Sequence, residues 1–145
     1  MHITRYTDYS LRVLMYLALK GEELATIREI AESYDISKNH LMKVVQDLNS
    51  KGYVVAIRGK NGGLRLADKP ENINIGHLVR DTEQDLALVE CFGNSQACAI
   101  TPACELKRVI FEALGAFFEV LDQYTLADLL PQGKGKHMVR LLRIG

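Results

Sequence analysis

The chain has 145 residues, of which 48% are hydrophobic and 25% charged, and its 18 basic and 18 acidic residues cancel to a formal net charge of zero. This length and composition are typical of one ordinary soluble globular domain. They exclude a membrane-spanning helix, because no apolar run approaches the roughly 18–20 residues that such a helix needs.

The N-terminus, MHITRYTDYS, lacks the apolar stretch and the small-residue cleavage site of a secretory signal. We therefore expect a cytoplasmic protein with no membrane association. Thiols stay reduced in that compartment, and the chain has an odd number of cysteines, three. Both points indicate free thiols rather than disulfides.

The zero net charge conceals an uneven distribution. Residues 1–70 carry 11 basic and 8 acidic residues, residues 71–130 carry 3 and 10, and residues 131–145 carry 4 basic residues and no acidic ones. Basic charge is densest within residues 36–69, where 7 basic residues stand against 2 acidic ones. A basic stretch of this kind favours contact with a polyanion such as DNA.

Three helices are predicted in the first fifty residues. The first covers 7–20, where apolar residues recur at helical spacing after a capping Thr7. Thr26 and Glu29 form a capping-box pattern that opens a short second helix, and Ser37 caps a third. Two short helices joined by about three residues have the outline of a helix-turn-helix.

A β-hairpin is predicted directly after the third helix. Two β-rich runs, 53–58 and 64–67, flank the sequence GKNGG, whose glycines and asparagine supply the positive φ angles of a tight turn. A hairpin in this position is the wing of a winged helix.

The second half is predicted to be helical around one cysteine-bearing loop. Residues 75–85 form a short helix, and we expect the side chains of Asp81, Glu83 and Asp85 on a solvated face. The loop 91–104 follows.

A long helix is then predicted from Thr101, with proline at its first position, to about Tyr124. Its apolar residues cover more than one narrow stripe, so we expect one face to pack on its own domain and another on a partner subunit. Thr125 begins a last turn, and the tail from Pro131 is expected to be loosely ordered.

The predicted fold is therefore mainly α with a small β-hairpin wing. A winged-helix DNA-binding unit covers 1–70. Residues 71–130 hold the cysteine loop and a dimerisation helix, and they form one compact unit with the winged helix. A flexible basic tail covers 131–145.

Two parts of the winged helix are placed to contact DNA. Side chains at the start of a recognition helix face base edges, where asparagine and lysine can bond adenine, guanine or a phosphate. Wing glycines let the backbone approach the sugar–phosphate chain, and a wing arginine suits a narrow minor groove. The candidate DNA-binding residues are Ser37, Lys38, Asn39, His40 and Lys43 in the helix, and Arg58, Lys60, Asn61, Gly62 and Arg65 in the wing. The alternative is that these are ordinary solvated charges.

The three cysteines lie within fourteen residues, at Cys91, Cys98 and Cys104. Thiolates favour Zn, Cu(I) and iron–sulfur clusters. Zinc sites usually have closely spaced cysteine pairs and four protein ligands, whereas this spacing is wider and no histidine lies in the loop. A cubane cluster takes four ligands, so one would come from elsewhere. The alternative is three reduced cysteines that hold no metal.

Several motifs resemble those of the Rrf-type winged-helix regulators, over about residues 1–130. They are TDYSLRVLMYLA, SKNHLMKVVQDLNSKGYV, AIRGKNGGLRLA, INIGHLVRDTE, CAITPACELK and YTLADLL. Within that family the chain is most similar to the nitric-oxide-sensing repressors. The RGKNGG wing, the three cysteines and the ITPAC turn are the specific parts of the resemblance.

The resemblance implies a homodimer on a palindromic operator in double-stranded DNA, with the long helices forming the dimer core. It implies an iron–sulfur cluster on Cys91, Cys98 and Cys104, of the 4Fe–4S type first and 2Fe–2S as the alternative. In the family the fourth ligand is not cysteine, and an acidic residue from the first helix of the other subunit, here Asp8, is the candidate. The alternative for Asp8 is a carboxylate favoured by the helix dipole.

One departure separates this chain from sister regulators of cluster assembly. Those have a histidine ligand just after the third cysteine, whereas Glu105, Leu106 and Lys107 stand there in this chain.

We therefore expect a transcriptional repressor whose cluster reacts with nitric oxide. The alternatives are an iron–sulfur or redox-responsive regulator of cluster assembly, and a metal-free or zinc-stabilised DNA-binding protein. An enzyme is not expected, because the chain has no Ser/His/Asp constellation, P-loop, H-E-x-x-H or Rossmann motif.

Overall fold

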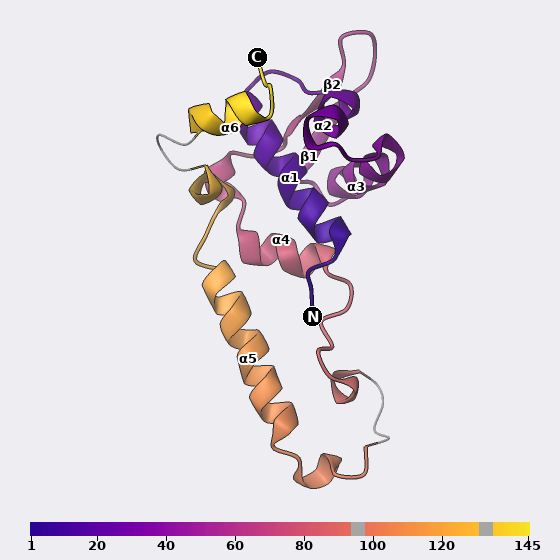
Figure 1. Cartoon of the computed structure of the whole chain (residues 1–145), viewed down its shortest axis with the longest axis vertical. Coiled ribbons are helices and arrows are strands. Elements are labelled where there is room, and N and C mark those ends of the chain that lie inside the picture. The colour runs from indigo at the N-terminus through magenta and orange to yellow at the C-terminus, as the bar shows by residue number, and fades with distance from the viewer. Residues whose placement is uncertain (94–97, 131–134) are drawn as a thin grey trace.

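The computed structural model describes residues 1–93, 98–130 and 135–145. Its N-terminal part is a helix-turn-helix followed by a two-stranded antiparallel hairpin, as Figure 1 shows. The elements are α1 (Arg5–Lys20), α2 (Ile27–Tyr34), α3 (Lys38–Ser50), β1 (Val54–Ile57) and β2 (Gly63–Leu66). The register pairs Val54 with Leu66 and Ile57 with Gly63. The predicted fold class, mainly α with a hairpin wing, is confirmed.

Side-chain caps explain where these helices begin. The Thr26 hydroxyl accepts from the Glu29 amide and the Glu29 carboxylate accepts from the Thr26 amide, which completes the predicted capping box. Ser37 caps α3, also as predicted. The first helix differs, because it begins at Arg5 with Thr4 as its cap. Thr7 is instead buried inside the first turn.

One hydrophobic core joins the winged helix to the helix that follows it. The helices α1, α2, α3 and α4 (Ile75–Thr82) and both strands contribute aliphatic side chains that are almost fully buried. The largest of them are Leu14, Leu17, Ile30, Leu41, Leu48 and Leu78. Burying a side chain of this size stabilises the fold by about 1.5–3 kcal/mol relative to leaving it in water, so α3 and the hairpin are held on a rigid base.

The wing turn depends on glycine. A Cβ at Gly62 would lie 2.1 Å from the Ile57 carbonyl oxygen, and Gly59 has a φ of +112°. No other residue type fits both positions without strain, so the GKNGG sequence fixes the shape of the wing loop.

The second half leaves the winged helix and returns to it. Short 3-10 turns η1 (Pro70–Asn72), η2 (Glu90–Phe92), η3 (Thr101–Ala103) and η4 (Leu126–Leu129) accompany α4 and α5 (Leu106–Leu121). Figure 1 shows α5 extending away from the winged helix. The chain then runs back beside the start of α4, where the Leu126 amide donates to the Ile73 carbonyl over 2.8 Å.

Helix α5 is attached to α4 near its C-terminal end. Phe118, its one buried residue, lies under the Arg80 guanidinium, whose central carbon is 4.4 Å from the centre of the ring. Arg80 also forms a bidentate ion pair with Asp122. A Cβ at Gly76 would clash with the Asp122 carboxylate and lie 3.0 Å from the Asp122 amide nitrogen, so a larger residue there would displace the side chain that pairs with Arg80.

Two later elements also differ from their predictions. The long helix begins at Leu106 rather than Thr101, because Cys104 has an extended backbone (ψ 120°) that separates the η3 turn from α5. The tail contains a helix, α6 (Gly135–Leu141), which packs on α1, and the Ser33 hydroxyl donates to the Leu142 carbonyl over 2.7 Å. Residues 131–134 of the predicted tail lie outside the described residues.

In the part of the chain that the structure describes, no helix combines the length and the hydrophobicity needed to cross a bilayer.

Candidate DNA-binding surface and cysteine segment

The start of α3 presents polar side chains to solvent. Lys38, Asn39 and Lys43 are exposed, whereas His40 is half-buried with its ring 4.9 Å from that of Tyr9. The Ser37 hydroxyl is committed to capping, since it accepts from the His40 amide. The first turn of α3 is therefore fixed by its cap and by α1, and its exposed side chains are free to reach a ligand.

The wing presents the second group of predicted residues. Arg58, Lys60, Asn61 and Arg65 are exposed around the half-buried Gly62. A groove of about 330 Å³ runs between the hairpin and the starts of α2 and α3, and Lys38 lines it together with strand residues. The structure thus places Lys38, the first residue of α3, beside the wing. A surface that contacts two adjacent grooves of DNA requires such an arrangement.

Two further residues on this surface were not predicted from the sequence. Met42 lies on the exposed side of α3 with 39% of its surface accessible, and an apolar side chain there suits a thymine methyl group. Arg28 lines the groove beside Lys38, exposed and paired with Glu32. The exposed apolar position on a recognition helix is the signal that would have identified Met42.

Asp8, the candidate fourth ligand, lies in the first turn of α1. It forms two hydrogen bonds with the Arg12 guanidinium, over 3.2 and 2.9 Å, and nearly half of its side chain is exposed. Arg12 lies 5.5 Å from the centre of the Tyr9 ring and 5.8 Å from that of Tyr34. Asp8 is therefore an accessible carboxylate with an intrahelical partner.

Residues 83–105, here called the cysteine segment, link α4 to α5. Cys91 lies in η2 and Cys104 ends η3, both half-buried, and Cys98 is exposed. All three are free thiols. The Thr101 hydroxyl and amide both donate to the Cys98 carbonyl, over 2.9 and 3.3 Å, which shapes the chain between Cys98 and Cys104. Residues 94–97 of the predicted cysteine loop lie outside the described residues.

The structure does not gather the cysteines into a formed metal site. Among the described residues, no group of three or more His, Cys, Asp or Glu side chains is positioned to hold a metal ion. The donor chemistry nevertheless fits a soft centre, because three free thiols lie on a segment whose described secondary structure is two single turns. None of its described residues is fully buried, although Leu86 packs against the hydrophobic core.

Helix α5 exposes an unusually apolar surface beside this segment. Leu106, Val109, Phe117 and Val120 recur at helical spacing with between 36% and 60% of each residue exposed. Phe111, 68% exposed, contacts Phe92 of the cysteine segment with the ring centres 6.0 Å apart. An apolar groove of about 390 Å³ runs between α5, the N-terminus and residues 86–88. Apolar surfaces of this extent mark interaction sites.

Comparison with known sequences decides the family. The family model of Rrf2, described as an iron-dependent transcriptional regulator, matches residues 3–132. The HTH-type transcriptional regulators NsrR of Bacillus licheniformis and Bacillus subtilis are each 57% identical to this chain over 132 residues, which is 90% of the chain and 92% and 90% of theirs.

The chain belongs to the Rrf2 family of transcriptional regulators. It is a DNA-binding regulator and not an enzyme. The resemblance to Rrf-type regulators seen in the sequence motifs is thereby confirmed, and NsrR proteins of several organisms are 51–57% identical to this chain.

Solved structures of the Rrf2 fold agree. The structure of CymR, the global cysteine regulator of B. subtilis, superimposes with a TM-score of 0.71 at 30% identity, covering 89% of this chain and 95% of that one. IscR of T. potens gives 0.69 at 26% identity, over 90% and 86%. The fold of this chain is therefore shared by CymR and IscR.

Proposed function

We propose that this Rrf2-family protein is a homodimeric transcriptional repressor that binds a palindromic operator. Its affinity for the operator is controlled by an iron–sulfur cluster that reacts with nitric oxide. The observation that carries the proposal is the placement of three free thiols, Cys91, Cys98 and Cys104, on the segment between the winged-helix base and the apolar helix α5. The similarity to NsrR proteins supports it. The protein would act in the cytoplasm, where DNA and reduced thiols occur together.

Dimerisation would bury α5. Its stripe of exposed aliphatic and aromatic residues has no cover among the described residues of this chain, and leaving it in water is unfavourable at about 25 cal/mol for each Å². A second copy supplies an equivalent stripe, and a two-fold axis between two α5 helices is the commonest way to pair such surfaces. Two recognition helices would then face two half-sites of a palindrome.

Operator contact would come from both parts of the basic surface. Lys38, Asn39 and Lys43 would meet base edges and phosphates from α3, with Ser37 and His40 fixing the turn. Arg58, Lys60, Asn61 and Arg65 would follow the adjacent backbone around Gly62.

The cluster would be held by the three thiolates, with Asp8 of the partner subunit as the fourth ligand. A 4Fe–4S centre requires four ligands and the described segment supplies three, and Asp8 is accessible once Arg12 releases it. When bound, the cluster would supply iron atoms that nitric oxide attacks. Loss of thiolate ligation would allow the cysteine segment to move. The spacing between α4 and α5 would then change.

One observation favours a second candidate. The thiols are not gathered among the described residues, which is what a metal-free or zinc-stabilised DNA-binding protein would also show. The absence of a histidine at 105–107 weakens the alternative of a cluster-assembly regulator.

Metal content tests the proposal directly. Protein purified without oxygen should contain iron and sulfide in equal amounts and absorb visible light, and Cys91→Ala should lose both. Colourless protein that contains zinc, or no metal at all, would establish the second candidate instead.

A further inference from the structure

We infer that Lys51 and Tyr53 are positioning residues that couple the cysteine segment to the recognition helix, through the last turn of α4. They flank Gly52 between α3 and β1, and neither residue has a role in the proposed function. The inference rests on the proposed function, because it concerns how a structural change in the cysteine segment is transmitted to α3.

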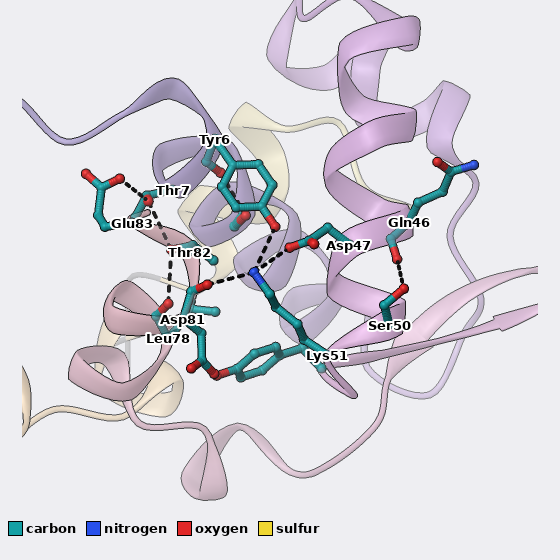
Figure 2. A network of polar contacts seen from close by, with 12 residues as sticks. Tyr6, Thr7, Gln46, Asp47, Ser50, Lys51, Leu78, Asp81, Thr82 and Glu83 are labelled. Carbon is teal, nitrogen blue, oxygen red and sulfur yellow. Dashed lines mark hydrogen bonds and ion pairs between the residues drawn. The ribbon is translucent and has the colours of Figure 1, made fainter. Parts of the chain in front are cut away.

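Lys51 joins three elements at once, as Figure 2 shows. Its ammonium donates to the Asp81 backbone carbonyl over 2.6 Å and lies 2.8 Å from the Asp47 carboxylate in α3. It also lies over the Tyr6 ring of α1, at 5.4 Å. The Asp47 Oδ2 atom is inaccessible to solvent, and the Lys51 ammonium is the charge that faces it. The Lys51 charge therefore compensates it, and the C-terminal end of α3 is tied to α4.

Tyr53 makes the second connection to the same residue of α4. Its hydroxyl donates to the Asp81 carboxylate over 2.5 Å, just before the chain enters β1. Burial and the bond to the Asp81 carboxylate together raise the pKa of Tyr53 well above its ordinary value, so the phenol stays a donor. Asp81 thus receives one bond from the residue after α3 and one from the residue before the wing.

The two residues after Asp81 connect to α1. The Thr82 and Thr7 hydroxyls form a buried hydrogen bond of 2.9 Å. The Glu83 carboxylate accepts from the Thr4 amide and hydroxyl, over 2.9 and 2.6 Å, and from the Thr7 hydroxyl over 3.0 Å. Residues 81–83, the α4 junction, therefore hold α1, the end of α3 and the start of the wing together.

The α4 junction is also where the cysteine segment begins. Glu83 is the residue after the end of α4, and Cys91 follows eight residues later. A rearrangement of the thiolates would pull on this end of the segment. Because hydrogen bonds and ion pairs weaken steeply when their geometry changes, α3 must either follow a shift of the junction or lose Lys51 and Tyr53 as restraints. Either outcome changes the orientation of the helix that reads DNA.

The test compares operator affinity of holo and apo protein for the wild type and for Tyr53→Phe. The wild-type ratio should be between about 5 and 150, the range that allosteric couplings usually span. Tyr53→Phe should reduce that ratio at least threefold, while its cluster absorbance and its reaction with nitric oxide remain as in the wild type. Lys51→Met should also reduce the ratio, and Lys51→Arg should retain it. Since Lys51 variants keep Tyr53, they decide the question if the phenylalanine variant folds poorly.

Tyr16→Phe is the matched control. It also removes a phenol that donates to a carboxylate, that of Glu29 over 2.8 Å, but this bond joins α1 to α2. The control should keep the wild-type ratio. A second readout is hydrogen exchange of the amides at 47–53, which cluster removal should change in the wild type and much less in Tyr53→Phe.

The outcomes separate the two claims. A wild type whose affinity does not depend on the cluster would overturn the proposed function. A wild type that responds, together with Tyr53→Phe and Lys51→Met variants that respond equally, would overturn the role of these two residues and leave the proposed function standing.

Discussion

The Glu83 side chain connects the end of α4 to the first turn of α1. Its position beside Asp81 and Asp85 predicted a solvated acidic face, but the structure places its carboxylate over the first turn of α1, where it accepts three hydrogen bonds. Burial alone would raise the pKa of Glu83. The bonds from Thr4 and Thr7 outweigh burial and hold the pKa below its ordinary value near 4.5.

The first prediction concerns the pH dependence of this stabilisation. A carboxyl whose pKa is lowered in the folded state stabilises the fold above its unfolded pKa, and that contribution disappears as the pH falls through the folded pKa. Glu83→Gln should therefore lower the free energy of unfolding by about 1 kcal/mol at about pH 7, discounted for partial exposure. The difference should shrink at about pH 3.5.

Urea unfolding of both proteins at the two pH values measures it. Asp85→Asn is the control, because among the described residues the Asp85 carboxylate bonds only the nearby Ala87 amide. An equal effect of Glu83→Gln at both pH values would show that the charge of Glu83 does not contribute.

A second prediction separates the two kinds of DNA contact. Lys43→Ala should weaken binding to all sequences alike and reduce the slope of log affinity against log salt by about one, because one phosphate contact is lost. Asn39→Ala should instead relax base preference at one position, at a cost of about 1–3 kcal/mol for the preferred base. Salt titrations on matched and mismatched operators distinguish them. Lys107→Ala, an exposed lysine on α5, should change neither.

At the scale of elements, α5 is an apolar helix whose side chains are largely exposed within one chain. It is the most apolar helix of the chain by sequence, yet Phe118 is its one buried residue. The sequence already indicated two packing faces. The structure shows that Phe118 packs on α4 and that the stripe of Leu106, Val109, Phe117 and Val120 stays exposed within one chain.

The third prediction tests that stripe. Val109→Glu should convert the dimer to a monomer of about 16.3 kDa, because a two-fold interface would have to bury the carboxylate twice. Helix content should remain, since Val109 is 47% exposed within one chain. Lys107→Glu, on the same helix, should remain dimeric. Sedimentation velocity measures both, and a dimeric Val109→Glu would show that this stripe is not the interface.

Other elements show what local patterns can and cannot predict. The capping box of Thr26 and Glu29 and the Ser37 cap were predicted correctly because their partners lie within three residues. The start of α5 was placed too early because the Thr101 hydroxyl bonds the Cys98 carbonyl and the chain extends at Cys104. The α6 helix was missed because it depends on contacts such as that of Ser33 with Leu142, which are 109 residues apart.

At the scale of the whole molecule, the chain combines a packed winged helix with a segment whose described secondary structure is two single turns. The winged helix rests on one buried core, whereas none of the described residues of the cysteine segment is fully buried. The sequence predicted the donor chemistry of the three thiols, because thiolates define the site by residue type. It did not predict their arrangement, which would be completed by the second subunit and by the cluster.

Operator affinity in three states of one preparation tests the central claim most directly. The protein would be measured by fluorescence anisotropy with its cluster, after chelation of the iron, and after anaerobic addition of nitric oxide. We predict tight binding only in the first state, with affinity reduced about 5–150-fold in the other two. Equal affinity in all three states would contradict the account.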